Sequence, residues 1–125
     1  MNNNSKHRVL IVDDEIAIRR SMAAFLEDFD FIVVAVESAE EAMEIVEKES
    51  FNVGVIDLRL PGMTGDILIQ KLKDKRPEMD FLIHTGSVDF QLTEELENLG
   101  LNKQSILLKP LRSLMVLVKR IQDMC

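Results

Sequence analysis

Five short, uninterrupted apolar runs are spaced along the chain, and they constrain its fold more than any other feature. They cover residues 9–12, 31–36, 53–56, 81–83 and 106–108, and they are rich in Val, Ile and Leu. None of them alternates between apolar and polar residues. Continuous apolar runs of this length are typical of strands that are buried on both faces, as in a parallel sheet covered by helices.

Amphipathic helical patterns follow each of these runs. In one of them Ala39, Ala42, Met43 and Val46 repeat at i, i+3, i+4 and i+7, and Ser38 with Glu41 predicts a capping box at its start. The other apolar stripes are Ile18, Met22, Phe25 and Phe29; Gly65, Leu68, Ile69 and Leu72; Leu92, Leu96 and Leu99; and Leu111, Leu114, Met115, Val118 and Ile121. Five strand–helix units predict an open, three-layer α/β sandwich, since a barrel would need eight of them.

The length and charge of the chain narrow its class further. Its 125 residues suit one domain, which we assign to residues 8–125, with residues 1–7 as a flexible polar tail. An excess of 22 acidic over 15 basic side chains argues against nucleic acid or an anionic membrane as the partner. The lone Cys125 excludes an internal disulfide, and neither a secretory signal nor a membrane-spanning run is present in the sequence, so we expect a cytoplasmic protein.

Polar side chains collect where the apolar runs end. Asp13 and Asp14 follow the first run, Asp57 the third, Thr85 the fourth and Lys109 the fifth. A single aspartate after a strand, such as Asp14, is often only a helix cap. Taken together, however, these residues would meet at one edge of the sheet, where clustered carboxylates require a cation and suit Mg²⁺. With a hydroxyl and a lysine, this is the set of groups used in phosphoryl transfer to an aspartate.

Four ordered motifs make the sequence resemble the receiver domain of two-component response regulators. The motifs are residues 9–15, 57–65, 84–86 and 107–110, and the resemblance covers essentially residues 8–125. It implies a flavodoxin-like, doubly wound parallel sheet of five strands in the order 2-1-3-4-5, with five helices. It also implies a signalling switch and not an enzyme, apart from catalysis of its own phosphorylation and dephosphorylation.

The resemblance also implies a role for each residue of the proposed site. Asp57 corresponds to the phosphoacceptor, and Asp14 to a direct ligand of Mg²⁺ (or Mn²⁺). Asp13 would hold the metal through water, and the backbone carbonyl of Arg59 would complete the protein's ligands. Lys109 would pair with the phosphoryl oxygens.

Further positions match auxiliary residues of the family. Thr85 corresponds to the switch hydroxyl, and Gly86 to a position kept small so that the phosphodonor reaches the aspartate. Pro110 would follow a cis peptide that aims the lysine into the site, and Gly65 matches a glycine of the loop after the phosphoacceptor strand, although ordinary turn chemistry would also explain it. Ile106 departs from the family, which commonly has an aromatic residue there, so the coupling to Thr85 is expected to differ.

Two residues outside these roles carry expectations of their own. His84 stands where the family usually has an aliphatic residue, and we expect a hydrogen-bonded histidine at the strand margin with no catalytic role. Val116 lies roughly opposite the apolar stripe of the fifth helix. If Val116 is exposed, it would suit binding of a partner or of a second copy. A wider buried face on the fifth helix would explain an apolar residue here equally well.

The partners implied by the resemblance are a sensor histidine kinase or phosphotransfer protein and a downstream effector. The fourth helix, fifth strand and fifth helix would form the responsive surface and a homodimer contact. The leading alternative is a receiver-like interaction module that acts without phosphorylation, which Ile106 favours. Two other functions rank well below it. A Mg²⁺-dependent phosphatase of the haloacid dehalogenase type is disfavoured because Arg59 stands where its second aspartate belongs, and a flavin-binding domain because Asp13 and Asp14 would repel phosphate.

Overall fold

A single parallel sheet organises the protein. The computed structural model describes residues 7–124, and the strand order is β2-β1-β3-β4-β5. The strands are β1 (Arg8–Val12), β2 (Ile32–Val36), β3 (Val53–Asp57), β4 (Asp80–Thr85) and β5 (Ile106–Leu108). The register places Val12 beside both Val36 and Ile56, and Asp57 beside His84. The predicted fold class and strand order are confirmed.

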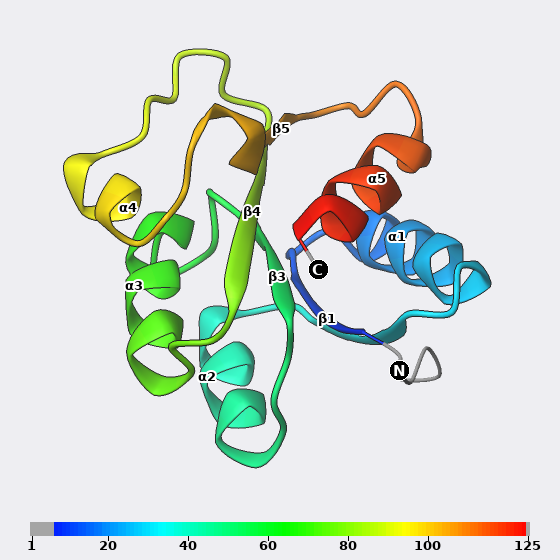
Figure 1. Cartoon of the computed structure of the whole chain (residues 1–125), viewed down its shortest axis with the longest axis horizontal. Coiled ribbons are helices and arrows are strands. Elements are labelled where there is room, and N and C mark those ends of the chain that lie inside the picture. Colours follow the sequence, from blue (N-terminus) through cyan, green and yellow to red (C-terminus); the bar gives the residue numbers. More distant parts are fainter. Residues whose placement is uncertain (1–6, 125) are drawn as a thin grey trace.

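Helices cover both faces of the sheet, as Figure 1 shows. The helices α1 (Ile16–Asp28) and α5 (Leu114–Met124) pack on one face, and α2 (Ala39–Lys48), α3 (Gly65–Lys75) and α4 (Glu94–Asn98) pack on the other. A short 3₁₀ turn at Lys103–Ser105 leads into β5. Each face has its own apolar core, so the predicted three-layer sandwich is confirmed. Within residues 7–124, no helix combines the length and apolar character needed to cross a membrane.

Local sequence signals account for several helix ends. Ser38 Oγ accepts a hydrogen bond from the Glu41 N–H at 3.1 Å, as the capping box predicts. The Glu41 carboxylate, however, accepts from the N–H of Glu37 at 2.9 Å, so the box is shifted by one residue on that side. At the end of α4, Gly100 adopts φ +102°, and the Leu101 N–H bonds back to the Leu96 carbonyl.

The expectation that all five apolar runs are buried on both faces is wrong for the two edge strands. The runs of β1 and β3 are buried, but Ile32 in β2 is 38% exposed and Leu108 in β5 is 46% exposed. The reason is their position, because β2 and β5 are the edge strands and each has a neighbouring strand on one side only.

The helix stripes also need correction at their ends. The helix α4 is shorter than its stripe, since Leu92 precedes it and Leu99 caps it. Phe29 lies beyond α1 and is exposed, while Leu26 fills the core instead. On α5, Leu117 is fully buried and Val116 is half-buried against the α1–α5 core, so Val116 is not opposite the core stripe. Residues 1–6 of the predicted tail and Cys125 lie outside the described residues.

Candidate functional site

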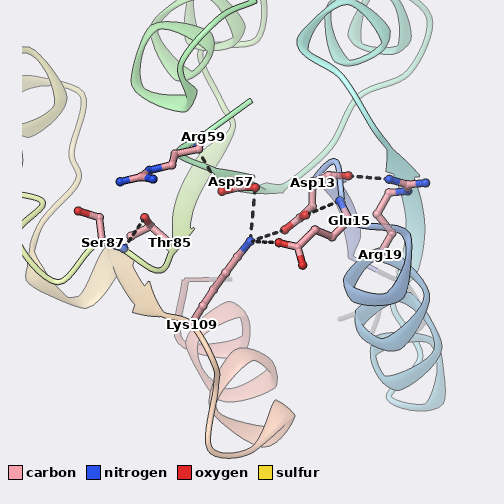
Figure 2. Close-up of polar contacts among 8 residues, drawn as sticks. All are labelled: Asp13, Glu15, Arg19, Asp57, Arg59, Thr85, Ser87 and Lys109. Carbon is pink, nitrogen blue, oxygen red and sulfur yellow. Dashed lines mark hydrogen bonds and ion pairs between the residues drawn. The ribbon is translucent and has the colours of Figure 1, made fainter. Parts of the chain in front are cut away.

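The carboxyl ends of four strands bring together four of the predicted site residues, as Figure 2 shows. Asp57 is the last residue of β3 and Thr85 the last of β4, while Asp13 directly follows β1. Lys109 follows β5, and its backbone N–H donates to the Thr85 carbonyl at 2.7 Å. The sheet therefore places three negative or polar groups and one ammonium at a single edge.

Three carboxylates form the centre of the site. Asp13, Asp14 and Asp57 each offer one oxygen, and these oxygens lie within 4.8 Å of one another. Asp13 and Asp57 are buried, whereas Asp14 is exposed at the mouth. Such a set of hard oxygen ligands, open to solvent on one side, fits a hydrated divalent cation of the Mg²⁺ type.

The carboxylate of Asp57 is held at both oxygens. Oδ1 accepts a hydrogen bond from the Arg59 N–H at 3.2 Å, and Oδ2 lies 3.4 Å from Lys109 Nζ. Burial raises the pKa of Asp57, and the negative charge of Asp13 raises it further, while the Arg59 N–H and Lys109 act in the opposite direction. The side chain is thus oriented, and its negative charge is incompletely compensated by the protein.

Lys109 pairs with both buried carboxylates of the acidic cluster and with Glu15 beside it. Its Nζ lies 3.2 Å from Asp13 Oδ2, 3.4 Å from Asp57 Oδ2 and 3.5 Å from Glu15 Oε1. Burial by itself would lower the pKa of Lys109, but the charges of Asp13, Asp57 and Glu15 outweigh that effect and raise it. Lys109 is therefore a permanent cation, and the Lys109–Pro110 peptide is cis, as the resemblance implied.

Two supporting contacts were missing from the sequence-based prediction. Asp13 Oδ1 accepts the Glu15 N–H at 2.9 Å, and the Asp13 carbonyl accepts Arg19 Nη1 at 2.8 Å. Glu15 is the last residue of the first motif, so its involvement had a sequence signal. Arg19 had none, because its reach back to Asp13 depends on where the first turns of α1 lie relative to β1.

A hollow of about 390 Å³ opens beside Asp57. Its walls include Thr85, Gly86 and Ser87, and it has the volume for a phosphoryl group with several waters. Thr85 is buried, and its Oγ1 accepts the Ser87 N–H at 3.1 Å. Ile106 does not line this hollow; it is half-buried in β5, where it pairs with Ile83.

The environment of His84 differs from the one predicted from the sequence. It is 4% exposed, and neither Nδ1 nor Nε2 has a hydrogen-bond partner among the described residues, so the expectation of a hydrogen-bonded histidine was wrong. Burial, aided by the positive charge of Lys109, lowers the pKa of His84 to about 4. The imidazole is therefore neutral at physiological pH and keeps one free donor and one free acceptor.

Gly65 packs closely against the backbone of Asp57 and Leu58. A Cβ at this position would lie 2.3 Å from the Asp57 carbonyl oxygen and 2.9 Å from Leu58 Cα. The Gly65 N–H also donates to the Leu58 carbonyl at 2.7 Å. A close approach of two backbones, more than ordinary turn chemistry, thus requires glycine here.

We therefore expect Gly65→Ala to destabilise the protein by about 2 kcal/mol, because the backbone of β3 must shift to admit the methyl group. Urea unfolding of both proteins measures the difference. Gly86→Ala is the matched control, since its Cβ meets only Lys109 Cβ, at 4.0 Å. We expect that control to stay within about 0.5 kcal/mol of the wild type, and equal losses in the two variants would contradict the packing argument.

Comparisons with known proteins agree on one family. The family model described as "Response regulator receiver domain" matches residues 9–122. A two-component response regulator PhoP from Pseudomonas aeruginosa is 33% identical over 103 residues, which are 82% of this chain and 45% of that protein. A cyclic di-GMP phosphodiesterase from Thermotoga maritima is 32% identical over 92 residues, or 74% of this chain and 24% of that protein.

A solved structure extends the likeness to three dimensions. A CheY-like response regulator receiver domain protein from Methanospirillum hungatei superimposes with a TM-score of 0.79 at 31% identity, covering 95% of this chain and 93% of that one. The present chain spans less than half the length of the curated relatives just described.

Proposed function

The chain belongs to the response regulator receiver domain family, and on that basis we propose that it is a phosphoacceptor switch whose acceptor is Asp57. Residues 8–125 form the receiver domain in this proposal. The phosphoryl group comes from a sensor histidine kinase, a phosphotransfer protein or a small phosphodonor, in the cytoplasm. The protein catalyses only its own phosphorylation and dephosphorylation.

One observation carries the proposal. Asp57 lies at the floor of the hollow with both oxygens oriented, beside Asp13 and Asp14 and within 3.4 Å of Lys109 Nζ. An oriented carboxylate with incompletely compensated charge is a suitable nucleophile for phosphorus. Catalysis of phosphoryl transfer depends mainly on such positioning and on charges that stabilise the equatorial oxygens.

Asp13, Asp14, Asp57 and the Arg59 carbonyl are the groups we assign to Mg²⁺, which receiver domains bind at an acidic pocket. When bound, the ion supplies positive charge that offsets the negative charge of the carboxylates and of the incoming phosphate. The three carboxylates carry more negative charge than Lys109 neutralises, and their oxygens are close enough to share one cation. The residues present therefore fit the metal.

In the proposed reaction an Asp57 carboxylate oxygen attacks phosphorus, and the bond from phosphorus to the donor's nitrogen or oxygen breaks. The electron pair of that bond leaves with the donor. Lys109 exchanges its ion pair with Asp57 for one with the phosphoryl oxygens, and the Thr85 hydroxyl leaves the Ser87 N–H to donate to them. Gly86 leaves the donor a clear approach, since a side chain there would stand at the open wall.

The signal would leave through the surface formed by α4, β5 and α5, which we assign to an effector or to a second copy. The added phosphoryl group carries about −1.5 to −2 charges, which is enough to rearrange the contacts of Lys109 and Thr85. Leu108, 46% exposed at the end of β5, is an apolar contact point on this surface. Ile106 and Pro110 lie on either side of residues 107–109, the segment that carries Lys109, and we assign them as auxiliary residues of the switch.

Intact-mass spectrometry after incubation with acetyl phosphate tests the proposal. We expect one phosphoryl adduct per chain with Mg²⁺ present and at least a tenfold lower yield with a chelator, because the ion supplies charge that the protein lacks. Borohydride reduction followed by peptide mapping should locate the adduct at Asp57. No adduct under any condition would refute the proposal and favour an interaction module that works without phosphorylation.

A further inference from the structure

The outer edge of β2 is unpaired and apolar along its whole length. The strand lies at the margin of the sheet, and no strand within residues 7–124 pairs with its outer side. Its five residues carry neither charge nor proline, and Ile32 and Ala35 are exposed. Proteins usually protect such an edge with charges, proline or a bulge, because an open edge pairs readily with another strand.

Two residues of β2 direct their backbone groups away from the sheet. The Ile32 N–H and the Val36 carbonyl are both hydrogen-bonded on the β1 side of the strand. Because successive residues of a strand alternate in this respect, the N–H and C=O groups of Val33 and Ala35 face outward. Within the described chain these groups remain available to a further strand.

We propose that β2 pairs with β2 of a second copy of this chain, antiparallel about a two-fold axis, so that the two sheets become one. Val33 of each copy then lies opposite Ala35 of the other, and each such pair exchanges two hydrogen bonds. Val34 meets its own counterpart on the axis. The ladder ends there, because the N–H groups of Phe31 and Glu37 already donate within the chain.

Charges on α1 favour a second copy as the occupant. Arg20 and Glu27 are exposed and lie two turns apart, on the far side of the helix from Ile18, which lines the cleft toward α5. They therefore face the β2 edge. Since α1 runs antiparallel to β2, Glu27 lies near the start of the strand and Arg20 near its end. The two-fold axis places Arg20 of each copy opposite Glu27 of the other.

The helix α2 repeats this arrangement with the signs reversed. Its α3 side is marked by the ion pair of Glu47 with Lys75. On the other side the Glu41 carboxylate accepts the N–H of Glu37, which directly follows β2, and the exposed Lys48 lies two turns further on. The same axis places Lys48 opposite Glu41 of the second copy. Both layers are thus self-complementary in charge, which an unrelated strand has no reason to match.

The contact is expected to be weak and independent of the proposed phosphorylation. Asp30 and Glu37 repel across the ends of the paired strands, and each copy carries a net charge of −7. We expect a dissociation constant of about 100 μM, typical of small interfaces. The contact lies at the opposite margin of the sheet from β5, so the surface formed by α4, β5 and α5 stays free.

Val34→Cys, in a Cys125→Ser background that leaves no other thiol, tests the register. Residues directly opposite in a non-hydrogen-bonded pair have Cα atoms about 4.5 Å apart, which suits a disulfide. Oxidation should link copies of this variant at least fivefold more than copies of Ala35→Cys, whose counterparts are two residues out of register. Ala35 is the more exposed position, so random collisions would favour that control instead. Non-reducing electrophoresis measures the linked fraction.

Sedimentation equilibrium at concentrations up to about 1 mM tests the charges. Glu27→Arg and Arg20→Glu should each weaken the dimer at least fivefold, because each puts like charges opposite one another. The double variant should restore wild-type affinity, since it only exchanges the two partners. Asp74→Arg, exposed on α3, makes the same change in net charge as Glu27→Arg and should stay within twofold of the wild type.

A wild type that remains monomeric at the highest concentration overturns the proposal. Equal linking of the two cysteine variants, or a double charge variant as weak as the single ones, overturns it as well. A dimer whose copies are not linked through Val34→Cys uses another surface, which also contradicts pairing at β2.

Discussion

An Asp57→Asn variant is expected to form no phosphoryl adduct under conditions in which acetyl phosphate and Mg²⁺ modify the wild type. The amide has no free carboxylate oxygen to attack phosphorus, and of the two buried aspartates that the structure describes only Asp57 lines the hollow. Intact-mass spectrometry of the two proteins side by side measures the loss. Complete loss of the adduct is the largest effect that we expect from any single substitution.

The same variant should remain folded. Burial disfavours the charge of Asp57 and raises its pKa, so removing that charge relieves a cost that the metal-free protein bears. We expect Asp57→Asn without Mg²⁺ to be at least as stable as the wild type in urea, and to gain less stability when Mg²⁺ is added. Asp80→Asn, at the exposed opposite end of the sheet, is the matched control and should be modified like the wild type. An adduct of undiminished yield in Asp57→Asn would show that the acceptor is another residue.

The second large effect concerns the pH dependence of stability. The pKa of His84 is about 4 in the folded protein and 6.5 in an unfolded chain, because the folded protein disfavours the charged ring. Below pH 6.5 the unfolded chain therefore binds a proton that the folded protein does not, and folding stability falls as the pH is lowered. The loss should reach about 3 kcal/mol by pH 4, at about 1.4 kcal/mol for each pH unit.

Urea unfolding of the wild type and of His84→Leu over this pH range measures the effect. The carboxylates titrate in both proteins, so the difference between the two stability curves isolates His84. We expect the difference to be constant above about pH 6.5 and to shift in favour of His84→Leu as the pH falls toward about 4. Parallel curves throughout would mean that the ring is protonated in the folded protein as readily as in the unfolded chain.

Most of the fold follows from local pattern. The uninterrupted runs that became β1, β3 and β4 are apolar because both of their faces meet helices, and that pattern is visible without any structure. The stripe of α3 is buried at each of its predicted positions. The exposure of the edge strands was harder to predict. The apolar runs of β2 and β5 look like the others in the sequence, and only the order of the strands gives each of them a single neighbour.

The candidate site was predictable to the extent that its members stand at strand ends. Asp13, Asp57 and Lys109 carry chemistry that is unusual after a buried strand, and the sheet brings them together as expected. Arg19 and the ion pair of Glu15 were not predictable in this way. Their contacts arise from the angle at which α1 leaves β1, which no spacing in the sequence records.

By itself, the sequence of this protein determined the alternation of strands and helices, the family, and the identity of the groups gathered at the carboxyl edge. The tertiary structure alone decided how those groups are solvated and paired. It buries Asp57 and His84 to similar extents, yet it gives the first two contacts and the second none among the described residues. The physical reason is that desolvation and ion pairing depend on everything that surrounds a group in space, and most of those neighbours lie far away along the chain.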